Sequence, residues 1–100
     1  MMKNILSIRE KEVYTSKVSS NTDPVRLASS IQLSLMSDKH VELLAMGKDS
    51  VYSMMKAICI TQGFAGQNGL KLRWQPGFKI VTGEHDGKKR TVLSWLIESF

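Results

Sequence analysis

The strongest constraint on the fold of this chain is a long β-hairpin predicted in its second half. Residues 70–81 alternate apolar and polar side chains with the period of two that is typical of a strand, and Pro76-Gly77 is expected to bend or bulge it. Asp86-Gly87 follows, a dipeptide that favours a type I′ turn. Residues 88–97 alternate again and form the return strand. The sequence therefore predicts two long antiparallel strands at the end of the chain.

A strand and a helix are predicted near the start. Residues 12–18 are rich in β-branched and aromatic types, which favours a strand. After a polar loop, Asp23 followed by Pro24 indicates a helix start, because a carboxylate can cap the first turn and proline fits the first helical position. The helix is expected to extend to about Ser37. Its core stripe comprises Leu27, Ala28, Ile31 and Leu35.

A second strand and helix follow. Residues 40–46 form a mostly buried strand that ends at Gly47. Asp49 or Ser50 can cap a helix that extends to about Gln62, and Gly63 is expected to end it. The order β-α-β-α-β-β predicts an α/β (α+β) sandwich, a four-stranded mixed sheet with both helices on one face. Residues 1–11 are expected to be an N-terminal extension and residues 12–100 a single domain.

Composition narrows the function classes. The chain has 100 residues, enough for one domain, and no apolar run approaches the roughly 20 residues that span a bilayer. No signal peptide is evident, and the single cysteine, Cys59, has no partner for an internal disulfide, so a reducing cytoplasm is expected. Zinc-ligand spacing, a nucleophile elbow and a phosphate-binding loop are all missing. We therefore expect no metal, no small-molecule cofactor, no membrane contact and no enzyme activity.

The positive charge lies mostly in the second half. The formal net charge is +5, and residues 1–50 carry seven Lys/Arg against six Asp/Glu, whereas residues 51–100 carry seven against three. Lys88, Lys89 and Arg90 follow the predicted turn, and Lys79 lies across the hairpin stem. This pattern indicates a basic arm that contacts phosphates. The alternative is a solvated hairpin whose lysines protect an exposed edge.

The second helix predicts self-association. The stripe expected to face the sheet comprises Val51, Met54, Met55, Ile58 and Gln62. Tyr52, Cys59 and Ile60 lie away from this stripe, where a surface helix is normally polar. We therefore expect a homodimer, with Val92 and Leu96 of the last strand adding to the interface. Ordinary exposed apolar surface is the alternative.

The stretch from Ala45 to Gly69 carries a family resemblance. Its Gly47, Lys56-Ala57, Ile60, Gly63-Phe64 and Gly69 stand in an order that resembles the stage V sporulation protein S family, within the Alba-like superfamily. The upstream strand, loop and helix, and Pro76, Phe78 and Arg90-Thr91 downstream, extend the resemblance over about residues 13–98. It implies the same β-α-β-α-β-β fold, a homodimer and a role in regulating development. By analogy with Alba proteins, it also implies nucleic-acid binding through the loop near the first helix and a basic β-hairpin.

A candidate nucleic-acid interface follows from the hairpin and this resemblance. The loop before the first helix has hydroxyls and an amide where Alba proteins have a lysine pair, and Lys48 beside it partly compensates. The expected contacts are Lys17, Ser19, Ser20, Asn21, Lys48, Lys79, Lys88, Lys89 and Arg90. The aromatic residues Trp74, Phe78 and Trp95 are expected to be core rather than base-stacking residues, because they are in phase with leucines.

Three functional hypotheses follow. The leading one is a non-enzymatic, dimeric, cytoplasmic regulator that binds DNA or RNA mainly through backbone phosphates. The alternative is a regulatory protein–protein interaction module on an Alba-like scaffold, with weak or no nucleic-acid binding. The third is a small-ligand binder, in which backbone amides at two helix N-termini hold an anion between the loop at Ser19–Asn21 and Gly47.

Overall fold

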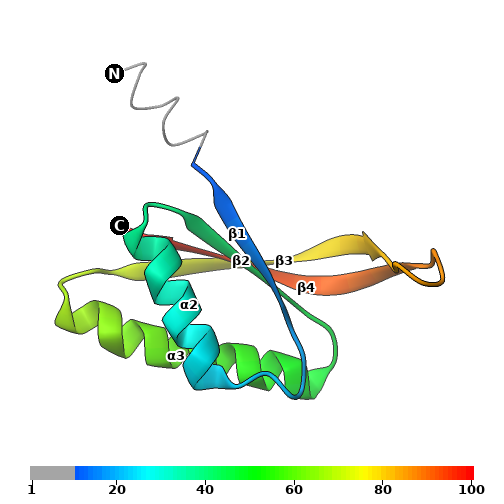
Figure 1. Cartoon of the computed structure of the whole chain (residues 1–100), viewed down its shortest axis with the longest axis horizontal. Helices are drawn as coiled ribbons and strands as arrows, with labels where there is room; N and C mark the ends of the chain where they lie inside the picture. Colours follow the sequence, from blue (N-terminus) through cyan, green and yellow to red (C-terminus); the bar gives the residue numbers. More distant parts are fainter. Residues whose placement is uncertain (1–10) are drawn as a thin grey trace.

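The computed structural model describes residues 11–100, so the predicted extension at residues 1–11 lies almost entirely outside the described residues. The elements are β1 (Val13–Val18), α2 (Pro24–Met36), β2 (His40–Ala45), α3 (Lys48–Gln67), β3 (Leu72–Thr82) and β4 (Lys89–Ser99). The sheet order is β1-β2-β4-β3, with β1 parallel to β2 and the other pairs antiparallel. Both helices cover one face of this sheet (Figure 1), which confirms the predicted four-stranded mixed sheet.

The first helix forms as the sequence predicts. The Asp23 carboxylate accepts a hydrogen bond of 3.0 Å from the Val25 amide, and Pro24 occupies the first helical position. The predicted core stripe is confirmed, because Leu27, Ala28, Ile31 and Leu35 are all buried. It packs against α3 and against β2, whose Val41, Leu43 and Ala45 point to the same core.

The ends of α3 differ from the prediction. Gly47, rather than Asp49 or Ser50, is the N-cap residue, at a φ of 90° and without a side-chain cap, and Ser50 is buried inside the first turns. Gly63 does not end the helix, which continues to Gln67. Thr61 and Ala65 remain buried, so their packing against the core keeps the helix intact despite the glycines in its last turns.

The face that α3 presents to the core also differs in part from the predicted stripe. Met54 and Ile58 are buried as expected, but Met55 and Gln62 are exposed. Ala57, Thr61 and Ala65 occupy the buried stripe instead. Small side chains at these positions let α2 approach closely, and the Thr61 hydroxyl is satisfied by donating to the Ala57 carbonyl at 2.8 Å. Within residues 11–100, no helix combines the length and apolar character needed to cross a membrane.

The hairpin is longer and more regular than predicted. The pairing continues without a bulge from Leu72–Ser99 to Thr82–Lys89, so Pro76-Gly77 does not interrupt it. The connection is a six-residue loop, residues 83–88, rather than a tight turn at Asp86-Gly87. Asp86 stabilises this larger loop, because its carboxylate accepts a 2.9 Å hydrogen bond from the Lys88 amide and pairs with Arg90.

The sheet has a helix-covered face and an open face. Trp95 and Ile97 of β4 lie on the covered face and are buried, as predicted for Trp95. The core prediction is wrong for Phe78, which is 79% exposed, and for Trp74, which is 42% exposed. Both belong to β3, one of the two edge strands, of which only Leu72 at its start is buried in the core.

Candidate nucleic-acid interface

One end of the sheet collects most of the predicted interface residues. The parallel strands β1 and β2 end side by side, with Val18 in register with Ala45, so the loop at residues 19–22 lies next to Gly47 and Lys48. The strand β4 pairs with β2 only from Leu93 to Ile97, and the hairpin therefore projects past this end as an arm (Figure 1). Lys17 Nζ lies 3.9 Å from Glu84 Oε1 of the hairpin loop.

The loop before α2 is stabilised by hydrogen bonds among its own residues. The Thr22 hydroxyl accepts from the Ser19 amide at 2.8 Å, and the Ser19 hydroxyl accepts from the Asn21 amide at 3.2 Å. The Thr22 amide donates to the Ser19 carbonyl at 3.1 Å. The Ser20 and Asn21 side chains are exposed and face solvent. The loop is therefore a preformed turn that offers two polar side chains rather than a cationic pocket.

The geometry gives no support to the anion-site hypothesis. At the N-terminus of α2, the amide of Val25 is already bonded to the Asp23 carboxylate. The N-terminus of α3 lacks a side-chain cap, but its first turn carries Asp49, which repels anions. Among residues 11–100, no three His, Cys, Asp or Glu side chains are grouped so that they could hold a metal ion.

The predicted cations divide into paired and unpaired groups. Lys79 binds Glu42 at 3.0 Å, and Arg90 pairs with Asp86 through both terminal nitrogens of its guanidinium. The Arg90 guanidinium, helped by the Lys88 amide, lowers the pKa of Asp86. Within the described part of the chain, Lys48, Lys88 and Lys89 are exposed and form no ion pair. Of the predicted contact residues, these three lysines are the cations most available to phosphate.

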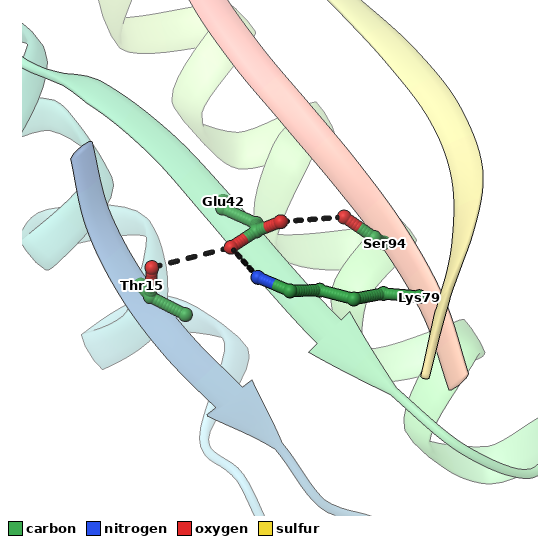
Figure 2. A network of polar contacts seen from close by, with 4 residues as sticks. All are labelled: Thr15, Glu42, Lys79 and Ser94. Carbon is green, nitrogen blue, oxygen red and sulfur yellow. Dashed lines mark hydrogen bonds and ion pairs between the residues drawn. The ribbon is translucent and has the colours of Figure 1, made fainter. Parts of the chain in front are cut away.

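A polar network that the sequence analysis did not predict crosses the open face. Figure 2 shows Glu42 of β2 at its centre, where the carboxylate accepts from Lys79 at 3.0 Å, Ser94 at 2.9 Å and Thr15 at 3.3 Å. Burial raises the pKa of Glu42, but the hydrogen bonds from Lys79 and Ser94 outweigh this and lower the pKa below its ordinary 4.5. One feature of the sequence could have indicated this network: Glu42 is a lone carboxylate in the middle of an otherwise apolar strand.

The five predicted dimer residues do not form one surface. Tyr52 is 63% exposed, and with Cys59 and Ile60 it lines an apolar hollow of about 530 Å³ between α3 and the start of α2. Val92 and Leu96 lie on the open face of the sheet, opposite the helices, and Val92 is buried there. The α3 flank is therefore an apolar surface separate from Val92 and Leu96, and the part of either surface in a dimer stays a prediction.

The comparisons place this fold in a family. A family model described as stage V sporulation protein S (SpoVS) matches residues 14–99. The chain belongs to the SpoVS family. A solved structure titled Alba from Thermoplasma volcanium is similar to this SpoVS-family chain, with a TM-score of 0.51 and 12% identity, over 86% of this chain and 95% of that one. A search of curated proteins found no match. The SpoVS-family chain is thus a sporulation-related protein with an Alba-like fold.

Proposed function

We propose that this SpoVS-family protein is a non-enzymatic dimeric regulator that binds DNA or RNA through backbone phosphates. The observation that carries the proposal is the projecting β3–β4 arm, on which Lys88 and Lys89 are exposed and free of ion pairs within residues 11–100. The Alba-like fold and the resemblance described above support this function.

The mechanism is electrostatic. Each lysine that neutralises a phosphate releases a condensed counterion, which favours binding at low salt. The arm extends about four residue pairs beyond β2, about 14 Å at the usual rise per residue, and a two-stranded ribbon fits the roughly 12 Å width of the DNA major groove. Lys48 lies at the base of the same end of the sheet. The proposed contacts are therefore Lys48, Lys88 and Lys89, supported by Lys17, Ser20 and Asn21.

The proposed dimer forms through the α3 flank. Tyr52 and Ile60 border the apolar hollow of about 530 Å³, and Lys56 lies over the Tyr52 ring at 4.8 Å. An isologous contact through this flank would cover the exposed apolar side chains and present two arms to one polymer. This arrangement would double the number of available cations without any new residue.

A direct binding titration tests the function. Fluorescence anisotropy with labelled DNA and RNA duplexes at low salt compares wild type, Lys88→Ala/Lys89→Ala and the matched control Lys71→Ala. Lys71 is exposed but precedes β3, whose first residue pairs with Ser99 at the end of the sheet away from the arm. The double variant is expected to lose affinity severalfold on either polymer, whereas the control keeps it. Equal affinities for all three proteins would contradict the proposed site.

A protein–protein interaction module is the second candidate function. It is favoured by one specific observation, that Lys79, Arg90 and the Ser19 hydroxyl all have partners inside the chain. The same binding titration distinguishes the two candidate functions. Absence of binding to either polymer at micromolar protein and low salt would favour the interaction module over the nucleic-acid binder.

A further inference from the structure

A small hollow lies on the open face of the sheet, at the base of the arm. Beyond the last residues that β4 pairs with β2, the hairpin projects in one direction while the ends of β1 and β2 turn away from it (Figure 1). The space between them measures about 170 Å³. We call it the arm-base hollow, and the side chains that face it are those of Lys17, Leu44, Met46, Val81 and Val92.

The walls of the arm-base hollow are apolar and already largely dry. Leu44 is 7% exposed and Val92 is 9% exposed, although both lie on the face of the sheet opposite the helices. An apolar group placed between them would therefore be removed from water on several sides. The Met46 side chain at the rim is exposed, and a flexible thioether adapts readily to the shape of a bound group.

The volume limits the size of the occupant. About 170 Å³ is close to the roughly 150 Å³ of an apolar cavity that holds benzene, and below the roughly 300 Å³ at which pockets for drug-sized ligands begin. The arm-base hollow therefore fits one small ring or a short branched chain, and it is too small for a nucleotide or a protein segment.

One positive charge accompanies this apolar lining. Of the described residues that line the hollow, Lys17 is the one that carries a charge. Its Nζ lies 3.9 Å from Glu84 Oε1, and both side chains are more than three-quarters exposed, so this pair is weak and easily exchanged for another carboxylate. A nucleobase fits the lining less well, because its polar edges would find few partners there.

We propose that the arm-base hollow binds a small monocarboxylic acid whose body is a single aromatic ring or a short branched alkyl chain. The body packs against Leu44, Val81 and Val92, and the carboxylate pairs with Lys17 in place of Glu84. The bound acid links the arm to the sheet beyond the last β2–β4 pair. This site goes beyond the proposed function, because its ligand is not a polymer and is recognised by a side-chain charge rather than by helix amides.

The test is a proton–nitrogen NMR titration of the full chain with three probes. Phenylacetate has a ring and a charge, phenylacetamide has the same ring without the charge, and acetate has the charge without the ring. Lys17→Met removes the charge but keeps most of the stem, and Lys71→Met is its matched control at the other end of β3. Val81→Trp fills the hollow, whereas Gln75→Trp adds the same bulk to the same face of β3 outside it.

The expected result depends on both the ring and the charge. Phenylacetate at millimolar concentration gives saturable shifts at the backbone amides of Leu44 and Val92, with an affinity about fivefold above that of phenylacetamide, and acetate gives none. Lys17→Met weakens phenylacetate binding about fivefold and leaves phenylacetamide binding within about twofold of wild type. Val81→Trp abolishes the shifts, and both control variants bind as wild type does.

Several results would overturn the inference, and most need no variant. On wild type alone, phenylacetate without saturable shifts around the hollow would do so, as would equal affinities for phenylacetate and either of the other two probes. Unchanged phenylacetate binding by Lys17→Met would contradict the assigned role of the lysine. Because the titration contains no nucleic acid, its failure leaves the proposed function untouched, and failure of the polymer titration leaves this site untouched.

Discussion

The network centred on Glu42 leads to a prediction about stability. The carboxylate accepts three hydrogen bonds that join all four strands on the open face, and only 17% of its side chain is exposed. Glu42→Gln preserves the shape of the side chain but removes its charge and one acceptor oxygen. The change therefore separates the contribution of the charge and its hydrogen bonds from that of packing.

The size of the effect follows from these contacts. The Lys79 side chain is 47% exposed, so its ion pair with Glu42 contributes about 0–1 kcal/mol. Hydrogen bonds to a charged group contribute about 1.5–3 kcal/mol, of which a neutral amide oxygen retains a part. Glu42→Gln is therefore expected to lower the free energy of unfolding by about 1–2 kcal/mol at pH 7. In a domain of this size, each 1 kcal/mol lowers Tm by about 4–8 °C.

The pH dependence gives an independent check. Because folding lowers the pKa of Glu42, the charge contributes stability at pH values above the ordinary 4.5, and that contribution is lost as the pH falls through the lowered folded value. Protonated Glu42 has nearly the same shape and charge as glutamine. The difference in stability between wild type and Glu42→Gln should therefore narrow as the pH drops below 4.5.

Urea denaturation monitored by tryptophan fluorescence, to which the buried Trp95 and the half-exposed Trp74 both contribute, measures both effects. It is run on wild type and Glu42→Gln at pH 7 and at several values below 4.5. The same series on Lys79→Met, alone and combined, isolates the ion pair. Equal stability of the two proteins at pH 7, or a difference that does not change with pH, would refute the reasoning.

Three further predictions concern other parts of the chain. Glu42→Gln frees Lys79, so the slope of log affinity against log salt on duplex DNA should steepen by up to about 0.9; an unchanged slope would exclude Lys79 from the footprint. Asp23→Ala removes the cap of α2 and should lower the stability by about 1 kcal/mol in thermal unfolding followed by circular dichroism, whereas Asp49→Ala, which removes only a charge near the start of α3 and no cap hydrogen bond, should cost less. Ile60→Asp charges the α3 flank and should convert a dimer to a monomer in analytical ultracentrifugation; a wild-type protein that is already monomeric at high concentration would remove the dimer from the proposal.

The topology could be predicted because local patterns agreed with one another. Asp23-Pro24 and the stripe from Leu27 to Leu35 specify α2 by capping and by periodicity, and both act within a few residues. The boundaries of α3 could not be predicted in the same way. Gly63 is a helix terminator when only the local sequence is considered, but the burial of Thr61 and Ala65 against the rest of the fold extends the helix past it.

The candidate site could be predicted only in outline. The sequence placed Lys88, Lys89 and Arg90 on the hairpin, but the six-residue loop and its Asp86–Arg90 pair depend on side-chain geometry across the turn. Phe78 alternates in phase with the core leucines, so periodicity alone predicts burial. Its exposure arises because β3 is an edge strand and Phe78 lies where the hairpin leaves β2, a consequence of the sheet order β1-β2-β4-β3 that no local pattern encodes.

The salt dependence of duplex binding tests the central claim most directly. Affinities of wild type and Lys88→Ala/Lys89→Ala for one DNA duplex are measured across a series of salt concentrations. If these two unpaired lysines neutralise phosphates, the double variant reduces the slope of log affinity against log salt by about 1.8, that is about 0.9 for each lost contact. Equal slopes for the two proteins would contradict the account, because the arm would then take no part in binding the polymer.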